Sequence, residues 1–267
     1  MGADIKKLRS RIKSVDSTLH LTRAMGLVAS SKIRRAMVAM EHGREYEAAV
    51  CGAIRPLLFS PECQRSPYMQ ERDGDRVCLV VIAGDRGLAG GYNANIFRAL
   101  RAHSYTTVIP IGKRACDRFG GKPCYAEGYS YTEAQALAKR LCEGFAAGEY
   151  DRVEILGTRY ISMLEQEPTL RRVLPLYAEG EAPRATTVFE PDEASVLDAA
   201  VPEYVAGILI STVRESFAAE VAARRTAMDA AGKNAEEMIA NLQLAYNRAR
   251  QGAITQEITE IVAGSGM

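Results

Sequence analysis

Hydrophobic residues at the start of the chain recur at the spacing of a helical coiled coil. Ile5, Leu8, Ile12, Val15 and Leu19 follow one another in alternating steps of three and four residues. This rhythm places apolar side chains along one stripe of an α-helix, as in a coiled-coil seam. The spacing therefore predicts a long N-terminal helix whose apolar stripe faces a second helix.

The rhythm shifts near Met25 and Gly26. The apolar residues that follow fall on a neighbouring stripe, which comprises Val28, Ile33, Met37 and Met40. A shift of this kind is typical of a stutter, which locally relaxes the supercoil of paired helices.

A second apolar stripe runs through the C-terminal part of the chain. Its members are Val205, Ile208, Leu209, Val213, Phe217, Val221, Met228, Ala231, Ala235, Met238, Leu242, Ala245, Ala249, Ile254, Ile258 and Ile261. Because alanine is small, the middle of this stripe would let two helices approach closely. The middle of the chain joins the end of the first helix to the start of the last, so we expect the two helices to run antiparallel. Two amphipathic helices packed separately on a domain are the alternative.

Proline divides the chain into three parts. All ten prolines lie between Pro56 and Pro202, and proline disfavours helix interiors. We therefore predict an N-terminal coiled-coil helix over residues 1–56, an inserted α/β domain with loops over 57–202, and a C-terminal coiled-coil helix over 203–267.

The inserted segment alternates between short apolar runs and amphipathic stretches. We predict strands at 77–83, 106–111, 123–126, 153–157, 170–176 and 186–189, and helices at 93–103, 113–119 and 132–147. Such strand and helix repeats favour a sheet of mostly parallel strands with covering helices. The predicted fold class is thus α/β: a long antiparallel two-helix coiled coil from the two termini, with an inserted Rossmann-like α/β domain of mostly parallel strands.

Charge and cysteine content narrow the function classes. Residues 1–55 contain 11 Lys and Arg against 5 Asp and Glu, so the first helix suits an acidic or phosphate-bearing partner unless its charges form an ordinary solvated face. No stacking aromatics are interleaved with these charges, which argues against nucleic acid. The six cysteines show no metal-ligand or redox spacing, so we expect no metal or cofactor and a reducing compartment.

A glycine-rich turn at residues 84–93 follows the first predicted strand and enters a helix. In dinucleotide-binding proteins such a turn holds a pyrophosphate. The spacing here matches neither the dinucleotide fingerprint nor the phosphate-binding loop of nucleotide hydrolases. We therefore interpret Gly84, Gly87, Gly90 and Gly91 as residues of a structural turn, with phosphate binding as the alternative. The adjacent Asp85 and Arg86 lack a partner for catalysis nearby in sequence, so we expect no catalytic residues.

Three blocks of sequence together resemble the γ subunit of F-type ATP synthases, the central rotor shaft. The first is Ile-Lys-Lys-Leu-Arg-Ser-Arg-Ile-Lys-Ser-Val at 5–15 with Leu-Thr-Arg-Ala-Met at 21–25, and the second is Asp-Arg-Gly-Leu-Ala-Gly-Gly-Tyr-Asn at 85–93. The third covers Tyr-Asn-Arg-Ala-Arg-Gln at 246–251 and Ile-Thr-Gln-Glu-Ile at 254–258. The chain departs from the family pattern at Gly84, Ala89, Val221 and Arg225.

The resemblance implies a shaft without catalytic activity of its own, which turns inside a ring of α and β subunits and couples ion flow to ATP synthesis or hydrolysis. Its implied partners are those α and β subunits, the ε subunit and a membrane-embedded ring of c subunits. The positions that match family contacts with the α and β ring are Arg23, Met25, Arg250, Gln251, Ile254, Thr255, Ile258, Ile261 and Val262. From about Ile254 onward we expect the last helix to extend past its partner.

The resemblance also implies a location on the cytoplasmic face of a bacterial inner membrane, reached through the c ring. The N-terminal residues lack the apolar core of a signal peptide. A coiled-coil adaptor with a nucleotide-sensing α/β head is the alternative function.

Overall fold

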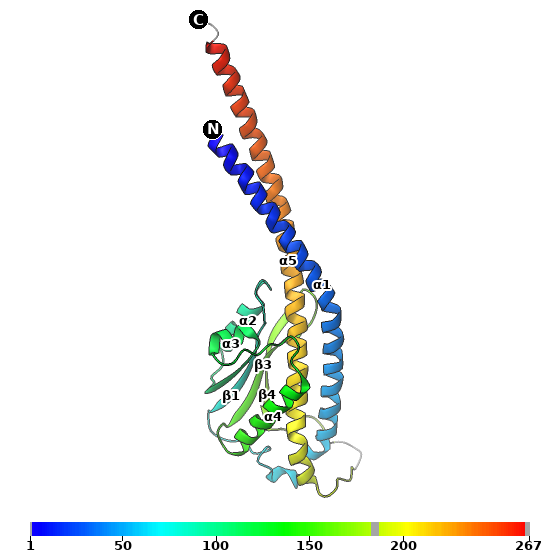
Figure 1. The fold of residues 1–267 in the computed structure, drawn as a ribbon. Helices are drawn as coiled ribbons and strands as arrows, with labels where there is room; N and C mark the ends of the chain where they lie inside the picture. The colour runs from blue at the N-terminus through cyan, green and yellow to red at the C-terminus, as the bar shows by residue number, and fades with distance from the viewer. Residues whose placement is uncertain (1, 183–186, 265–267) are drawn as a thin grey trace. The chain divides into compact units, whose positions relative to one another are not determined.

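A computed structural model describes residues 2–182 and 187–264 of the chain (Figure 1). Its elements, in chain order, are α1 (Gly2–Leu58), a 3-10 turn η1 (Cys63–Arg65), β1 (Val77–Ile82), α2 (Tyr92–Leu100), β2 (Thr107–Ile111), α3 (Lys113–Phe119), α4 (Tyr131–Ala146), β3 (Arg152–Tyr160), β4 (Gln166–Leu174) and α5 (Glu193–Gly264). The chain forms two compact units. The coiled-coil unit comprises residues 1–30 and 224–267, and the α/β unit comprises residues 31–223.

The sheet of the α/β unit has the strand order β2-β1-β3-β4. β1 pairs in parallel with both β2 and β3, whereas β4 runs antiparallel to β3 at the edge. All six residues of β1 are buried, as expected for a central parallel strand covered on both faces. The predicted α/β class with a mostly parallel sheet is therefore confirmed.

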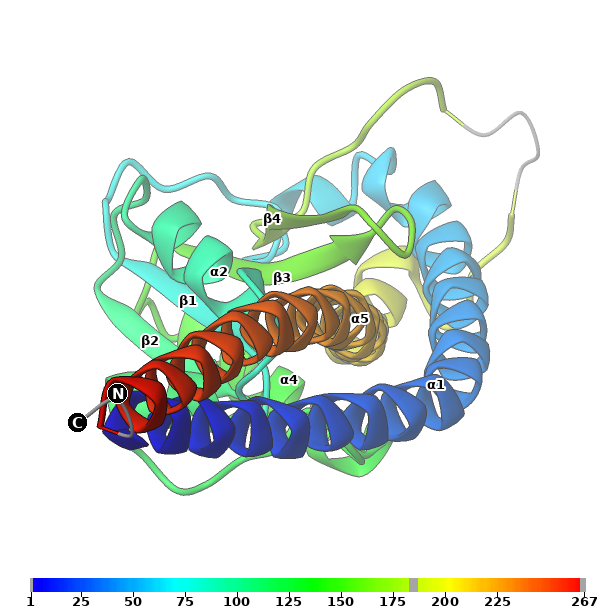
Figure 2. The same ribbon diagram turned by 90° about the horizontal axis from the view of Figure 1, so that it is seen from above.

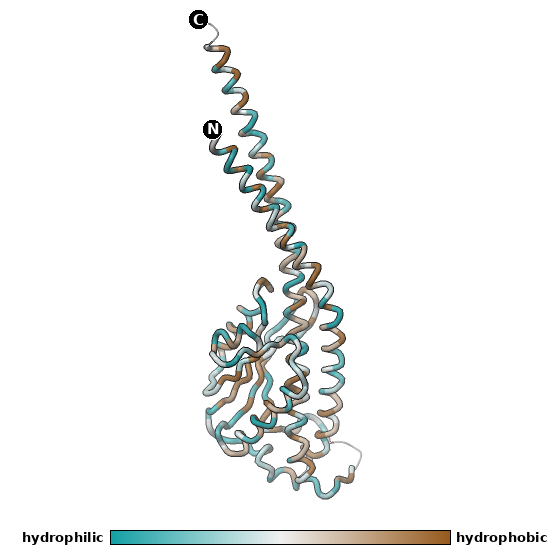
Figure 3. The backbone as a smooth tube through the Cα atoms, viewed as in Figure 1, coloured by the Kyte–Doolittle hydropathy of each residue, from teal (hydrophilic) through white to brown (hydrophobic). Residues whose placement is uncertain are grey.

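Helices cover both faces of this sheet. On one face, Leu79, Val81 and Leu156 form a buried cluster with Ile96 and Leu100 of α2. The other face packs against α4, α5 and the last part of α1, as Figure 2 shows from above. Hydrophobic residues accordingly gather in the strands and in the part of α5 that lies against them (Figure 3).

Inside the inserted segment, the element positions agree with the predictions except at four predicted strands. Residues 123–126 form no strand, and residues 187–189 form none either, while Thr186 lies outside the described residues. The strand predicted at 170–176 begins earlier, at Gln166, and ends at Leu174, because its partner β3 is also longer than predicted. In an antiparallel hairpin, backbone pairing can continue past the apolar runs from which the two strands were predicted.

The two prolines used as boundaries both lie inside helices. Pro56 lies in the last turn of α1, which ends at Leu58, and Pro202 lies in the interior of α5, which begins at Glu193. The first helix thus ends two residues beyond the predicted boundary at residue 56, and the predicted start of the last helix at residue 203 is wrong by ten residues. Val201 and Val205, which flank Pro202, are fully buried, so tertiary packing maintains the helix despite the hydrogen bond that proline removes.

The coiled-coil unit contains residues 2–30 of α1 and 224–264 of α5, and its two helices run antiparallel. Leu19 of α1 faces Gly232 of α5. Gly26, which lies later in α1, faces Met228, which lies earlier in α5. Both members of these pairs are buried, which confirms the predicted antiparallel pairing (Figure 1).

The seam differs from the predicted one on both helices. On α1 the buried positions continue at Thr22, Gly26 and Ala29, so the rhythm does not shift, and Val28 is 52% exposed. On α5 the predicted members Met238 and Ala245 are exposed. The predicted members Ala235, Leu242 and Ala249 do lie in the seam, and Gly232, Ile239, Tyr246 and Ala253 complete it; all seven are buried or half-buried. The predicted stripe missed Gly232, Ile239 and Tyr246 by one residue each, because it passed through Ala231, Met238 and Ala245.

One stretch of α5 has the length and mean hydropathy of a membrane span. However, 56% of its most apolar window is buried inside the protein, as in the core helix of a domain. This stretch is therefore weak evidence for a span.

Candidate functional site

Arg23 and Met25, the predicted contacts on α1, lie beside the seam of the coiled-coil unit. Arg23 donates to Glu236 of α5 over 2.6 Å, and both side chains are about half exposed, at 56% and 51%. An exposed ion pair of this kind contributes roughly 0–1 kcal/mol, so the guanidinium can exchange its partner at small cost. Met25 is half-buried. The arginine is thus available to a carboxylate on another subunit.

Arg225 is a residue of this unit to which sequence reasoning assigned no role. Its Nε lies 2.7 Å from Asp229 Oδ2, and its Nη1 donates to the backbone carbonyl of Gly26 over 3.3 Å. Arg225 therefore links the two helices at Gly26, where no side chain covers the α1 backbone. The only sequence signal was its departure from the family pattern.

The C-terminal end of α5 is an exposed aliphatic surface. Ile254, Ile258, Ile261 and Val262 are 43%, 56%, 70% and 64% exposed. Since Ala253 is the last half-buried residue of α5 and α1 begins at Gly2, the helix extends past its partner from Ile254 onward, as Figure 1 shows. Ile254, Ile258 and Ile261 share one face of a helix. Contiguous exposed aliphatic residues of this kind mark a protein interaction surface.

Polar residues accompany this tip. Arg250 and Gln251 are exposed, and Thr255 is exposed with its hydroxyl donating to the Gln251 carbonyl over 3.0 Å. The amide and guanidinium groups can therefore bond a partner directly.

Further exposed apolar residues lie on the outer faces of the same unit. Sequence reasoning either placed them in the seam or overlooked them, and they are Leu21 (59%), Leu27 (71%), Val28 (52%), Met238 (44%) and Leu244 (58%). The sequence could have shown that these residues point away from the seam, but only with the correct seam register. They extend the candidate contact surface along both helices.

The glycine-rich turn of the α/β unit binds a carboxylate of the same chain. Glu220 of α5 is 1% exposed, and its carboxylate accepts from the backbone N–H groups of Asp85 over 3.2 Å and Arg86 over 3.3 Å. Asn93 accepts from the Gly84 N–H over 2.9 Å. These are the amides that a phosphate would use in a nucleotide-binding turn. An internal anion already satisfies them.

Asp85 organises the neighbouring loops rather than a reaction. Its carboxylate accepts from the backbone N–H groups of Lys113 at 3.2 Å, Ala126 at 2.9 Å and Glu127 at 2.7 Å. The side chain is 7% exposed. Three amide donors leave little capacity for a catalytic role. Arg86 pairs with Glu127 at 3.5 Å.

The four glycines of the turn differ in how strictly the structure requires glycine at their positions. A Cβ on Gly84 would lie 2.9 Å from Glu220 Cδ, so only glycine permits this approach. Gly90 has a φ of +56°, which glycine adopts without strain. At Gly87 an added Cβ would meet a mobile arginine end at 3.1 Å, and at Gly91 it would make ordinary contacts. Leu88 has a φ of +58° and is 63% exposed.

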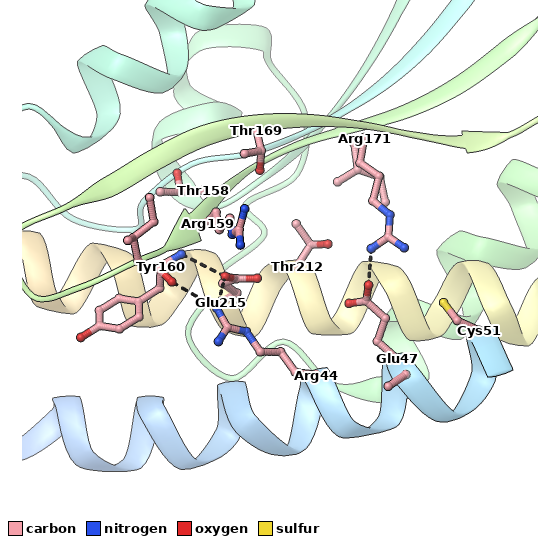
Figure 4. Close-up of a pocket in the computed structure, with 13 residues that line it drawn as sticks. Arg44, Glu47, Cys51, Thr158, Arg159, Tyr160, Thr169, Arg171, Thr212 and Glu215 are labelled. Carbon is pink, nitrogen blue, oxygen red and sulfur yellow. Dashed lines mark hydrogen bonds and ion pairs between the residues drawn. The ribbon is translucent and has the colours of Figure 1, made fainter. Parts of the chain in front are cut away.

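A pocket of about 840 Å³ lies between the β3–β4 hairpin, α1 and α5 (Figure 4). Two ion pairs cross it: Arg44 with Glu215 at 2.5 Å, and Arg171 with Glu47. Cys51 also lines it, and burial raises the pKa of its thiol although Arg171 opposes that effect. Glutamates therefore neutralise Arg44 and Arg171 in this pocket, and the raised pKa keeps the Cys51 thiol protonated near neutral pH.

Among the described residues, no cluster of three or more His, Cys, Asp or Glu side chains could hold a metal ion. The features with functional character are therefore the exposed coiled-coil surfaces and the polar contacts between α5 and the sheet.

Comparison with known proteins gives one consistent result. A family model described as ATP synthase matches residues 4–266. The ATP synthase gamma chain of Ruminococcus albus is 40% identical over 98% of both chains, and that of Geotalea uraniireducens is 35% identical over 98% of both. A relative from Acetobacterium woodii, named a sodium ion specific ATP synthase gamma chain, is 34% identical over 99% of both chains.

Solved structures agree in fold. A chain of the Euglena gracilis mitochondrial ATP synthase, in a structure of its OSCP, F1 and c-ring, matches with a TM-score of 0.72 over 99% of this chain and 94% of that chain, at 18% identity. A chain of the Tetrahymena thermophila mitochondrial ATP synthase central stalk and c-ring matches with a TM-score of 0.62, at 21% identity, over 79% of this chain and 99% of that chain.

Proposed function

This chain belongs to the ATP synthase gamma chain family and is a non-catalytic central-stalk subunit, and we propose that its exposed coiled-coil tip turns in an aliphatic bearing formed by a ring of α and β subunits. The observation that carries the proposal is the overhang of α5 beyond α1, with four exposed aliphatic residues at its end. Apolar contacts are not directional, so they hold a turning helix centred without resisting its rotation.

Arg23, Met25, Arg250, Gln251 and Thr255 supply the directional contacts with the same ring. Arg23 already pairs with a carboxylate of its own chain, and an acidic lever on a β subunit would offer an equivalent partner. Because exposed ion pairs are weak, such contacts can form and break as the shaft turns. The asymmetric shaft then favours a different conformation in each β subunit by differential contact.

The α/β unit is the part that would stand on a ring of c subunits beside an ε subunit. This assignment rests on the family and on the c-rings named with the structural neighbours. It implies a peripheral position on the cytoplasmic face of a bacterial inner membrane, held there through the c ring. The adaptor alternative gains no support, because Glu220 already uses the amides of the glycine-rich turn.

Co-purification tests the shaft role. The tagged chain, expressed with the α and β subunits of its own complex, is expected to purify with a nucleotide-binding hexamer, whereas the isolated chain should not bind nucleotide. Micromolar binding of ATP by the isolated chain, with no hexamer recovered, would favour the adaptor instead.

Truncation and substitution test the tip. Ending the chain after Thr255 should weaken torque but leave some rotation, since the remaining seam is intact. Replacing both Arg250 and Gln251 by Ala should impair assembly or ATP turnover. Full coupled synthesis by the truncated complex would count against the aliphatic bearing, and unchanged hydrolysis by the double variant would count against the polar contacts.

A further inference from the structure

Three polar side chains of α5 bond the backbone at the end of the sheet. Glu215 accepts from the Tyr160 N–H over 3.0 Å, and Ser216 Oγ accepts from the Thr158 N–H over 2.9 Å. Glu220 accepts from the N–H groups of Asp85 and Arg86 in the turn after β1, as described above. We call Glu215, Ser216 and Glu220 the α5 lock.

The lock lies in a stretch of α5 that is otherwise apolar. Ala218, Ala219, Val221 and Ala222 are at most 1% exposed, and so is Glu220 itself. Removing a carboxylate from water is unfavourable unless hydrogen bonds replace the lost hydration. An apolar side chain at this position would avoid that cost, so burial alone does not account for a glutamate here.

Hydrogen bonds differ from apolar contacts in that they have direction. Packed apolar surfaces hold a helix against a sheet but allow small sliding and turning movements, whereas a hydrogen bond weakens steeply when its angle changes. The lock residues extend over more than one helical turn and bond both β3 and the turn after β1. This arrangement opposes rotation of α5 about its axis as well as translation along it.

Two further contacts spread the attachment. The Tyr92 hydroxyl of α2 donates to the Ser216 carbonyl over 2.8 Å and is itself buried. Asp85, whose N–H is bonded by Glu220, holds the start of α3 and the segment before α4 through its carboxylate. The lock is therefore connected to the ends of β1 and β3 and to the loops beside them.

We propose that the α5 lock is the point at which torque passes between the shaft helix and the α/β domain. Glu215, Ser216 and Glu220 are positioning residues, because they fix the angle of α5 relative to the sheet. The inference rests on the shaft role proposed above.

Single-molecule rotation of the assembled complex tests the lock. The α and β ring is fixed to a surface, a bead is attached at the exposed Lys122 of the α/β domain, and its angular variance is recorded during the pauses between steps. Ser216→Ala removes one acceptor. Glu220→Gln keeps the side-chain volume but replaces one acceptor oxygen by a donor that faces an N–H group. Glu45→Gln, an exposed glutamate of α1 in the same unit, is the matched control.

The angular variance should rise about twofold in the Ser216→Ala, Glu220→Gln double variant, because about half of the lock's bonds to backbone N–H groups are lost. The double variant should hydrolyse ATP at the wild-type rate. The Glu45→Gln control should keep the wild-type angular variance. A role in stability alone would lower the melting temperature without changing the variance at low temperature.

Unchanged variance in the assembled double variant would overturn the inference. If the double variant does not assemble, Ser216→Ala decides in the same way, since it removes a single hydroxyl. A wild-type bead that does not rotate would refute the shaft role and with it the lock, whereas a rotating bead with unaltered variance in the variants refutes the lock alone.

Discussion

Two glycines in the seam of the coiled-coil unit are expected to be replaceable by alanine with a gain in stability. Gly26 and Gly232 are buried in the centre of helices, where glycine is normally unfavourable. A Cβ added to Gly26 would lie 3.6 Å from Asp229 Oδ1 and 3.7 Å from Met228 Cβ. At Gly232 it would lie 3.8 Å from Thr22 Oγ1 and 3.9 Å from Leu19 Cδ1. These are ordinary van der Waals distances, so a methyl group fits at both positions.

The expected gain follows from backbone entropy. Alanine is favoured over glycine in a helix interior by about 1 kcal/mol, and the methyl group adds contact with the facing helix. Because 1.4 kcal/mol corresponds to a factor of ten, about 1 kcal/mol should make local opening roughly fivefold rarer. Each of Gly26→Ala and Gly232→Ala should therefore lower the population of the open coiled coil by about that factor.

Hydrogen exchange on the full chain measures this effect locally. Amides of residues 19–26 and 228–239 should exchange roughly fivefold more slowly in either variant, under conditions where exchange reports the opening equilibrium. Amides in the central sheet should not change, because the substitutions lie in the other unit.

Two glycines of the α/β unit provide the opposite case. A Cβ on Gly207 would lie 2.8 Å from Val50 Cγ2, and one on Gly43 would lie 3.2 Å from Ser211 Cα. Gly207→Ala should destabilise, and Gly43→Ala should gain nothing, although both remove the same backbone entropy. If Gly26→Ala and Gly232→Ala exchanged as fast as wild type, or if Gly207→Ala stabilised equally, the argument from available space would be refuted.

Three further predictions concern the α/β unit. Because Arg76 holds the pKa of Asp151 below its ordinary value, the stabilisation from this pair is complete above about pH 4 and is lost as pH falls through the lowered pKa; Asp151→Asn should flatten the acid limb of stability measured by urea unfolding. Phe145 is fully buried, so Phe145→Ala should lower the free energy of unfolding by about 3–5 kcal/mol in the same assay. Burial raises the pKa of Cys78 to about 11 and that of Cys142 to about 12, so mass spectrometry after iodoacetamide treatment of the native chain should find both far less modified than the half-buried Cys124.

Periodicity was sufficient to predict the arrangement of the elements. The run at 77–83 corresponds to β1, the stretch at 113–119 coincides with α3, and the long terminal stripes correspond to α1 and α5. Proline misled at both helix boundaries, because Pro56 and Pro202 are tolerated inside helices that tertiary contacts support. Helix propensity gives the free-energy cost of a proline inside a helix. Whether packing offsets this cost depends on the burial of neighbours such as Val201 and Val205, which the local sequence does not reveal.

The seam register failed for a related reason. Val28 and Met238 are large and apolar, yet they point to solvent, whereas Gly26 and Gly232 are buried between the helices. Hydrophobicity scales rank these residues in the opposite order. In a closely packed seam, small size allows the burial of a residue whose hydrophobicity alone would not predict it, so glycines must be considered together with the large apolar residues when the register is predicted.

The glycine-rich turn shows the limit of reasoning from neighbouring residues. Its sequence contains the free amides and the following helix of a phosphate site, and the partner of those amides, Glu220, lies far along the chain in another helix. A phosphate would have to displace a carboxylate that is part of the same folded chain and is almost completely buried, which would leave that charge without its donors. The same chemistry that binds an anionic ligand in an enzyme therefore fastens a shaft helix to its domain here. For a turn of this type, the nearest buried acid on any packed helix decides between the two roles.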